Sequence, residues 1–501
     1  MTALITKEFR MHNALQFKEQ FSESTPDSVY MFIGKATAWP SDASPPTPVD
    51  SDFQTYYEPW ENMIAMKRIT TSDVSFSSNR FNWTSGTVYT QYSSDLDINS
   101  SQYYVITDEF KVYKCISNNA GAQSTIKPTS TSTSTFKLGD GYTWKYMLTL
   151  DAAGAVKFLS SDHFPVKTLT VDDSSLQWDV QDTAIDGGIH SIRITSGGSA
   201  YLSSTGSVVS ATSTTAVLSG SASGTNSVYN DYAIYIISGT GAGQIRTISA
   251  YNGTTKAVTV SSAWTTTPDA TSVYIVSPRI VLNGNGSGFI GYTTVTSGAI
   301  TAIEVTNPGS GYTKVTGSIA GNTGSGATIS PQYSPIGGHG SNATAELNGH
   351  NVTMNVRFSG TESGNFLVEN DFRVVGLIVN PRLVAGDVVA TGTVYDMTYK
   401  ITVSSISGIF TKDEVITGGT SGATATILDI DGTTISVNNV SGTFTGGETI
   451  TGGTSSATCL FTSIANPLVA KYTGNIIYLK NQLPIFRTAD QTEDYRVVVK
   501  F

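Results

Sequence analysis

The chain has 501 residues, more than one hydrophobic core usually organises, so about two to four domains are expected. Its formal net charge is -10, only 14% of its residues are charged, and no cluster of Lys or Arg could neutralise successive phosphates, which argues against a nucleic-acid partner. No apolar run approaches the roughly 20 residues that span a bilayer, so neither membrane insertion nor a classical export signal is expected.

The composition predicts a mainly β protein, because Gly reaches 48 residues and Ser and Thr fill the stretches between aromatic segments. We expect an antiparallel β-sandwich core with a small α/β N-terminal part, plus inserted small β domains. Cys115 and Cys459 stand in no metal-binding or redox spacing, which is typical of a protein that matures in a reducing cytoplasm.

The N-terminal segment predicts a helix followed by a strand and a second helix. Residues 4–21 predict an amphipathic helix, because their apolar residues recur at multiples of four. These residues are Ile5, Phe9, Phe17 and Phe21. The run 29–33 (VYMFI) predicts a buried strand, and residues 60–68 (WENMIAMKR) predict a short helix.

A hairpin and an aromatic strand come next. Residues 103–116 (YYVITDEFKVYKCI) predict a hairpin with Asp108 and Glu109 near its turn. Further on, Asp140-Gly141 is a strong turn dipeptide. The three rings of Tyr142, Trp144 and Tyr146 then alternate with other residues, which places them on one face of a strand. We interpret this stretch as a turn leading into a core strand rather than as a ligand platform.

Two internal duplications indicate inserted β modules. Residues 408–427 return as residues 442–461, an offset of 34 residues, and each copy predicts a β-hairpin unit. A weaker pair is 188–201 and 299–312. The segment at about 207–277 between them predicts a nested module, because the interrupted repeat resumes after it.

No stretch of the sequence predicts catalysis, a cofactor or a metal ion. The GTGAG loop at 239–243 lacks the following Lys and the helix of a phosphate-binding loop, so it predicts a turn. Asp429 and Asp431 begin like a calcium loop but lack its later ligands, which favours a hairpin turn. His339 is the one histidine in a tight context, and no further ligands are nearby. We therefore expect no catalytic, cofactor-binding or metal-binding residues.

An ordered set of short blocks carries a family resemblance. The blocks are FIGKATAW (32–39), VYKCI (112–116), GDGYTWKYML (139–148), NP (380–381) and IIYLKNQLPIFRTADQTEDYRVVVKF (476–501). Together they resemble the baseplate wedge subunit encoded by the eighth structural gene of T4-like contractile-tailed bacteriophages. The last block is the most specific part. The residues that match the family pattern, or that we expect to serve in structure and interaction, are Asp140, Gly141, Tyr142, Trp144, Tyr478, Asn481, Pro484, Asp490, Gln491, Thr492, Tyr495 and Phe501.

The resemblance implies a non-enzymatic virion component of the tail baseplate, assembled in the bacterial host cytoplasm. It implies a homodimer within each wedge, beside the wedge proteins of the sixth, seventh and tenth structural genes. No cofactor is implied.

The resemblance also sets the expected domain boundaries. The expected segments are 1–185 (first part of the family core), 186–330 (an inserted β domain with the nested module at about 207–277), 331–383 (core continuation), 384–465 (a second insertion with the two repeats) and 466–501 (C-terminal core strands).

Two other functions stay open at this point. A host-receptor or glycan-binding tail protein is favoured by the Gly/Thr-rich modules and by exposed aromatic residues. A capsule-degrading enzyme would need two carboxylates at a defined separation, and no spacing in the sequence nominates such a pair.

Overall fold

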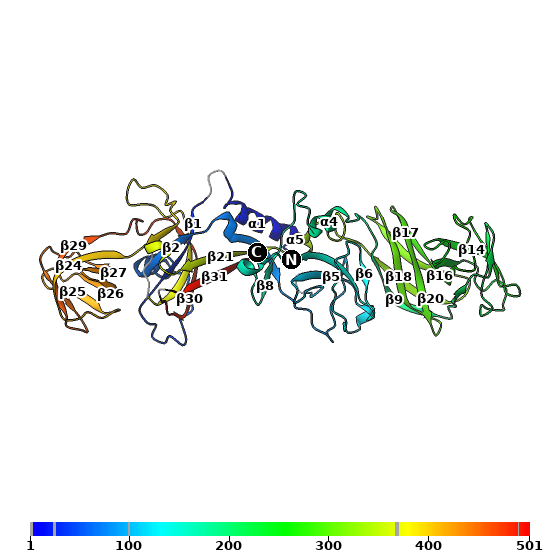
Figure 1. Cartoon of the computed structure of the whole chain (residues 1–501), viewed down its shortest axis with the longest axis horizontal. Coiled ribbons are helices and arrows are strands. Elements are labelled where there is room, and N and C mark those ends of the chain that lie inside the picture. The colour runs from blue at the N-terminus through cyan, green and yellow to red at the C-terminus, as the bar shows by residue number, and fades with distance from the viewer. Residues whose placement is uncertain (1–3, 24–26, 99–100, 366–369, 489) are drawn as a thin grey trace. The chain divides into compact units, whose positions relative to one another are not determined.

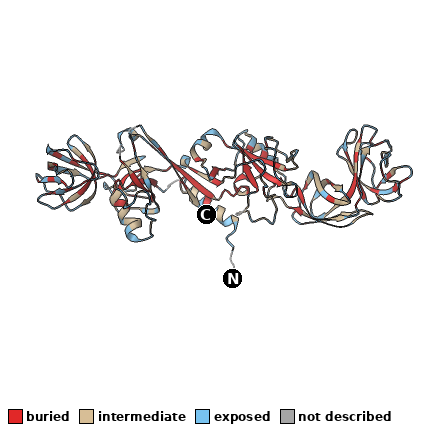
Figure 2. Ribbon diagram, turned by 90° about the horizontal axis from the view of Figure 1, so that it is seen from below, coloured by how far each residue is buried: buried red, intermediate tan, exposed pale blue. Residues whose placement is uncertain are grey.

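The computed structural model describes residues 4–23, 27–98, 101–365, 370–488 and 490–501. It is mainly β, with several antiparallel sheets and a closed barrel (Figure 1), which confirms the predicted mainly β class. Buried residues, red in Figure 2, lie largely along the strands. Within these ranges no helix combines the length and apolarity needed to cross a membrane.

The chain divides into two compact units. The first contains the residues up to Ser77, Val156–Leu159 and His350–Phe501, and the second contains Ser78–Ala155 and Ser160–Gly349. The segment 1–185, expected to be one part of the core, therefore contributes to both units.

The first unit contains one long helix, several short helical turns and the strands of the barrel and of the sheet around β1. Its elements are α1 (Lys7–Glu19), β1 (Val29–Gly34), η1 (Phe53–Tyr57), α2 (Glu58–Asn62), β2 (Met63–Arg68), η2 (Thr71–Asp73), β3 (Val74–Asn79, whose last two residues belong to the second unit), β21 (Asn351–Ser359), η4 (Glu362–Gly364), β22 (Phe372–Val379), β23 (Val394–Asp396), β24 (Tyr399–Ser407), β25 (Val415–Gly418), β26 (Thr424–Asp431), β27 (Thr434–Ser441), β28 (Thr449–Gly452), β29 (Thr458–Ala465), β30 (Asn475–Ile485) and β31 (Thr492–Lys500).

The second unit is built almost entirely of strands. Its elements are β4 (Tyr104–Ile106), β5 (Lys111–Ser117), η3 (Asn119–Gly121), β6 (Phe136–Lys137), β7 (Thr143–Thr149), α3 (Ala152–Phe158, whose last residues belong to the first unit), β8 (His163–Pro165), α4 (Leu176–Asp182), β9 (Ser191–Ser199), β10 (Ser204–Ser207), β11 (Ser210–Ala211), β12 (Thr215–Val217), β13 (Tyr232–Ser238), β14 (Ile245–Asn252), β15 (Ala257–Val260), β16 (Val273–Gly284), β17 (Ser287–Thr296), β18 (Ala299–Ser310), β19 (Val315–Ala320), β20 (Ser325–Gln332) and α5 (Ala343–Glu346).

Strand β1 is the centre of the first unit. It lies third in a five-stranded sheet of order β23-β2-β1-β22-β30, and all six of its residues are buried. Met31 and Ile33 enter one apolar cluster, whereas Tyr30 and Phe32 enter another. The predicted strand at 29–33 is confirmed, and its unbroken apolar run is explained by burial on both faces.

The two helix predictions in this unit have different outcomes. Helix α1 is confirmed, and Thr6 caps it by accepting a hydrogen bond from the Phe9 backbone N–H. Ile5 and Phe9 nevertheless remain 57% and 54% exposed, so the apolar stripe is buried only towards its C-terminal end. The helix predicted at 60–68 is wrong: only Glu58–Asn62 is helical, and Met63–Arg68 is strand β2, because its apolar run is buried between two neighbouring strands.

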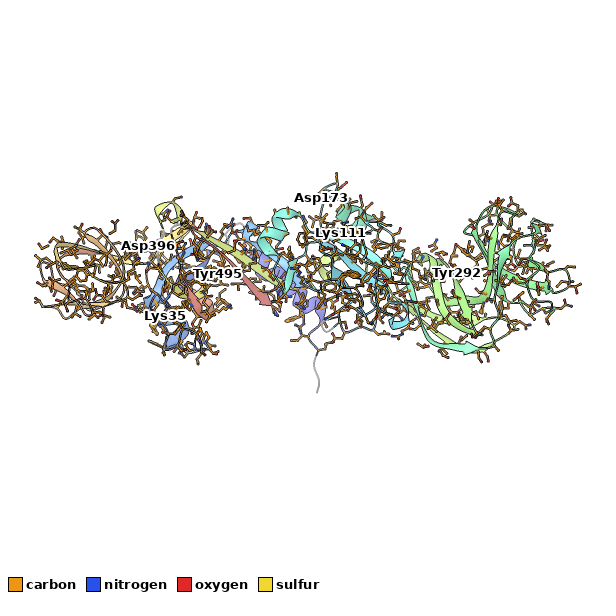
Figure 3. The ribbon with its side chains drawn as sticks, turned by 60° about the horizontal axis from the view of Figure 1, so that its bottom comes forward. Lys35, Lys111, Asp173, Tyr292, Asp396 and Tyr495 are labelled. Atoms are coloured by element: carbon orange, nitrogen blue, oxygen red, sulfur yellow. The ribbon has the colours of Figure 1, made fainter. Side chains whose placement is uncertain are left out.

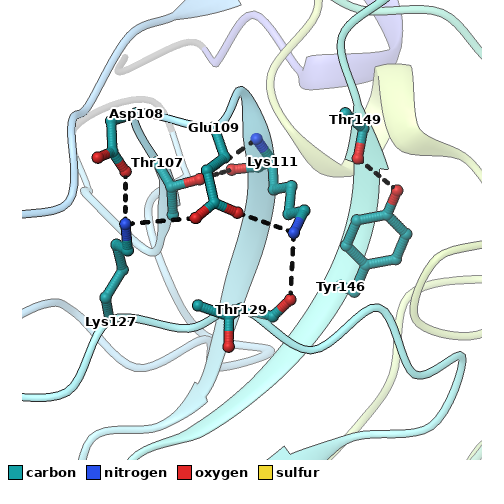
Figure 4. Close-up of polar contacts among 8 residues, drawn as sticks. All are labelled: Thr107, Asp108, Glu109, Lys111, Lys127, Thr129, Tyr146 and Thr149. Atoms are coloured by element: carbon teal, nitrogen blue, oxygen red, sulfur yellow. Dashed lines mark hydrogen bonds and ion pairs between the residues drawn. The ribbon is translucent and has the colours of Figure 1, made fainter.

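The hairpin predicted at 103–116 is confirmed as β4 and β5. Thr107 N–H donates to the Lys111 carbonyl at 2.9 Å and closes the turn. Figure 4 shows that the acidic turn residues are engaged by lysines: Asp108 lies 2.8 Å from Lys127, and Glu109 lies 2.9 Å from Lys111. These are exposed ion pairs, which contribute little to stability.

The weaker duplication contains a glycine with positive φ at the same position of each copy. Gly198 and Gly309 both have φ +63, and an added Cβ at either would meet backbone within about 2.5 Å. The interrupting segment, about 207–277, folds around its own apolar cluster. Strand β16 joins the two parts, because its first half pairs with β13 and its second half pairs with β19. The GTGAG stretch is the turn between β13 and β14, as predicted.

The stronger duplication forms one closed barrel of order β24-β27-β26-β25-β28-β29. The predicted hairpins are present as β25–β26 and β28–β29. Each repeat also contributes an earlier strand, β24 or β27, so the structural repeat begins before residue 408. Asp431 ends β26 and the next strand begins at Thr434, which confirms the predicted hairpin turn.

The two repeats hold each other through exchanged glutamates. Glu414 accepts hydrogen bonds from the Thr454 and Ser455 backbone N–H groups at 3.0 and 2.9 Å. Glu448 does the same for Thr420 and Ser421, at 2.9 Å each. Burial opposes ionisation of Glu448, but these donors outweigh it and lower its pKa to about 2. Neither repeat is therefore complete without the other.

We expect that residues 399–465 can be replaced by a short linker without unfolding the rest of the first unit. The barrel has its own apolar cluster, and Lys400 and Ala465 are cross-strand neighbours, so the chain enters and leaves at one place. The deletion variant should unfold cooperatively in a denaturant titration. Deletion of β27–β29 alone should aggregate, because it leaves half a barrel. Loss of cooperative unfolding in the complete deletion would contradict the prediction.

Candidate functional site

Tyr142, just before β7, and the aromatic residues of β7 pack in the core of the sheet β4-β5-β7-β6. Tyr142 and Trp144 are fully buried and Tyr146 is 1% exposed. The Tyr142 and Trp144 rings stack at 5.5 Å, and Tyr142 donates its hydroxyl to the Ala122 carbonyl at 2.6 Å. Rings enclosed in this way present no face to a ligand. The structure therefore supports the interpretation of this stretch as a core strand.

The Asp140-Gly141 turn holds a neighbouring loop in place. The Asp140 carboxylate accepts from the Thr125 and Ile126 backbone N–H groups at 2.9 and 3.0 Å. Gly141 has φ +85, and an added Cβ would come within 2.5 Å of the Asn119 amide nitrogen. The acid is thus occupied by backbone donors, and the glycine is required by both conformation and space.

The opposite face of β7 is also buried, which the alternation of rings did not predict. Lys145 is 3% exposed and donates to the Thr133 carbonyl. Burial lowers the pKa of its ammonium to about 8. The sequence signals of a polar cluster beneath the sheet were this lysine in the middle of the aromatic strand and His339 in its glycine-rich context.

An ion pair lies at the centre of that cluster. Lys114 of β5 and Glu346 of α5 are 2.8 Å apart, with side chains 0% and 2% exposed. The other carboxylate oxygen of Glu346 accepts from the Gly340 and Asn342 backbone N–H groups at 2.8 and 3.2 Å. The Lys114 ammonium also lies 3.9 Å from the centre of the Tyr92 ring. Sequence reasoning missed this pair because its members are far apart in the chain.

Two histidines pack against this ion pair. The His339 ring meets the His190 ring edge-on at 5.0 Å, and its Nδ1 lies 3.9 Å from Glu346. Burial, followed by the field of the nearby lysines, lowers the pKa of both imidazoles, that of His190 to about 4. Across the part of the chain that the structure describes, no three His, Cys, Asp or Glu residues are grouped to hold a metal ion. Cys115 and Cys459 are buried free thiols.

A second buried ion pair organises the C-terminal block of the first unit. Arg487 lies 2.9 Å from Glu493 with side chains 1% and 7% exposed, and it donates to the Gly360 carbonyl at 3.0 Å. Gly360 N–H in turn donates to the Gln491 carbonyl at 2.9 Å. These contacts fix the turn that contains Asp490 and Gln491 just before Thr492 begins β31. Neither partner of this pair was among the predicted site residues.

The other predicted residues of this block serve packing and anchoring. Tyr495, labelled in Figure 3, packs against Phe372 at 5.8 Å and accepts from the Gln482 amide at 2.9 Å. The Phe501 carbonyl accepts from Arg10 at 2.7 Å. Tyr478 packs on the unit's apolar cluster, and Asn481 donates to the Pro46 carbonyl at 2.8 Å. Pro484 lies near the end of β30, and Asp490 is exposed.

The predicted residues therefore fall into two groups, one in each unit, and do not build a single site. The residues of both groups mainly pack against or hydrogen-bond to other residues of their own unit. Comparison of the chain with protein-family models and with curated proteins yields no match. The geometry defines two structural centres. One is the aromatic strand with the buried ion pair Lys114–Glu346, and the other is the ion pair Arg487–Glu493 before β31.

We expect Glu346→Gln to lower the free energy of unfolding of the second unit by roughly 3–5 kcal/mol, because it leaves the Lys114 ammonium buried without its counter-ion. The double variant Lys114→Met/Glu346→Gln should recover much of that loss. Glu109→Gln, which breaks the exposed pair with Lys111, is the matched control and should change stability by less than about 1 kcal/mol. Equal effects of the two single variants in denaturant titrations would contradict the prediction.

We expect removal of residues 495–501 to abolish cooperative folding of the first unit. The deletion strips Tyr495, Val497 and Val499 from the apolar cluster, and burial of Val497 alone is worth about 1.5–3 kcal/mol. Solubility and thermal unfolding would be compared with the full chain. Lys500→Ala is the control, since that side chain is exposed. A truncated chain with an unchanged melting temperature would show that β31 is dispensable.

Proposed function

We propose that the protein is a structural subunit of a bacteriophage tail baseplate wedge, a non-enzymatic scaffold of the virion that acts as a homodimer among other wedge proteins. One observation carries the proposal: the GDGY-x-W residues that resemble the wedge subunit are used entirely inside the fold. Tyr142 and Trp144 are fully enclosed, and the Asp140 carboxylate is occupied by backbone donors. Such residues specify a shape rather than a reaction.

The low charge of the chain supports the same proposal. Large β surfaces with few charges suit permanent packing against fixed neighbours, and obligate interfaces are more apolar than transient ones. The neighbours proposed from the resemblance are the wedge proteins of the sixth, seventh and tenth structural genes. The two expected insertions, residues 186–330 and 384–465, have no counterpart in the family pattern.

A second candidate function, recognition of a host glycan, is favoured by one feature of the second unit. A groove of about 630 Å³ is lined by polar residues that include Asn118, His190 and Thr301. Polar side chains suit sugar hydroxyls. The lining contains no Phe, Tyr or Trp on which a sugar ring could stack, so this candidate is the weaker one.

We expect the purified protein to sediment at about twice its chain mass of 53.0 kDa at micromolar concentration. A clean monomer would contradict the homodimer. A structure of the assembled particle gives the decisive test of location: a position between wedge proteins supports the scaffold, whereas projection from the periphery supports glycan recognition.

A further inference from the structure

Four aromatic residues gather at the surface of the first unit, and none of the centres described above uses them. Phe53, Tyr56 and Tyr57 belong to η1, and Tyr472 precedes β30. We name these four residues the aromatic surface. Phe53 is 65% exposed, Tyr57 48% and Tyr472 40%. Exposed rings of this size, gathered in one place, mark interaction sites more often than single exposed residues do.

The three tyrosine rings pack on one another. Tyr57 lies 5.2 Å from Tyr56 and 5.5 Å from Tyr472, centre to centre, and Tyr56 lies 6.2 Å from Tyr472. Tyr56 donates its hydroxyl to the Tyr472 carbonyl. The rings therefore hold fixed positions before any partner arrives, which lowers the entropy lost on binding.

The backbone beneath the rings is unusual and firmly anchored. Segment η1 is a π-helical turn, a geometry that is found frequently at functional sites. Tyr472 has φ +59, in the left-handed region that non-glycine residues rarely adopt. Trp60, in the next helix, is 1% exposed and fixes the segment to the unit's core.

The charge around the aromatic surface is acidic. Between Lys35 and Lys67 the chain has no basic residue but has five acids, namely Asp42, Asp50, Asp52, Glu58 and Glu61. Three of these acids face basic groups, since Asp42 pairs with Arg373, Glu61 lies 2.7 Å from Lys471, and Glu58 interacts electrostatically with Lys35. Asp50 and Asp52, next to Phe53, are exposed.

The exposed rings and the acidic side chains beside them favour some binding partners over others. A second copy of the chain related by a twofold axis would bring the acidic segment against itself, and like charges repel. A neutral sugar would use a ring face but would leave the exposed carboxylates without a counter-charge. A guanidinium can lie on a tyrosine face while a nearby carboxylate holds its N–H groups.

We propose that the aromatic surface docks an arginine-bearing segment of a neighbouring protein, with a guanidinium against Tyr57 and with Asp52 as its counter-charge. Arginine fits better than lysine because its planar group combines stacking with directed hydrogen bonds. The inference rests on the proposed scaffold function for the existence of such a neighbour. Peptide binding can fail while sedimentation and assembly succeed, so the two proposals fail separately.

The test uses the full chain and a fluorescein-labelled dodecapeptide that repeats Arg-Gly-Ser, with a Gln-Gly-Ser peptide as the neutral probe. Binding is measured by fluorescence anisotropy at low and moderate salt for four variants. Tyr57→Ala and Asp52→Asn remove the ring and the charge. Tyr57→Phe keeps the ring. Asp387→Asn removes an exposed acid elsewhere in the same unit and is the matched charge control.

The chain should bind the arginine peptide and not the neutral one. Tyr57→Ala and Asp52→Asn should each weaken binding by about fivefold or more, whereas Tyr57→Phe and Asp387→Asn should stay within about twofold of the parent. Thermal melts confirm that each variant is folded. Absence of binding, or equal losses for Asp52→Asn and Asp387→Asn, would overturn the proposal, since the second result reports only attraction to net charge. Binding of maltohexaose that Tyr57→Ala abolishes would assign the surface to sugars instead and would also overturn it.

Discussion

The second unit depends on the buried ion pair between Lys114 and Glu346. A charge with so little exposure is tolerated only when its counter-charge and hydrogen bonds are in place, because an isolated buried ion costs several kcal/mol. The two residues are 232 positions apart, and the inserted β strands β9–β20 lie between them. The buried ammonium on β5 therefore receives its counter-charge only from α5, which follows that insertion in the chain. A local motif thus depends on a distant segment.

The inserted modules all join their host segments with the same geometry. In each, the chain enters and leaves on cross-strand neighbours: Ser191 pairs with Gln332, Ser204 with Val276 and Lys400 with Ala465. Because the first and last residues of each module are neighbours, the host segments on either side keep their positions. A module can therefore be inserted without displacing the host strands. The nested module follows the same rule inside its own host. Each module also carries its own apolar cluster, although Leu428 of the barrel packs into the cluster around β1.

The sequence predicted elements whose cause is local and missed those whose cause is distant. The helix α1, the strand β1, the hairpin at 103–116 and the paired hairpins of the repeats all follow from periodicity and turn residues. The helix predicted at 60–68 is wrong because a short apolar run is compatible with either a buried strand or a helix. Pairing with β1 and β23 makes most of this segment a strand. The repeat was placed too late because β24 and β27 share few residues beyond Ile401/Ile435 and Val403/Val437. The pair Lys114–Glu346 left no recognisable spacing because its members are 232 residues apart. The pair Arg487–Glu493 is local, but neither residue stands in a pattern that predicts its burial.

The residues of the aromatic strand that resemble the wedge subunit and the outward-facing rings of η1 are different sets. Asp140 and Tyr142 hydrogen-bond to backbone groups of the fold and Trp144 is fully buried, whereas the exposed rings of Phe53 and Tyr57 lie outside every block of the resemblance. This separation suits the proposed scaffold function, because the fold must persist while each contact surface adapts to one neighbour. In such a protein the buried motif residues identify the core, whereas the exposed side chains indicate which partners can bind. The acidic, aromatic surface around η1 is where that chemistry is concentrated in the first unit.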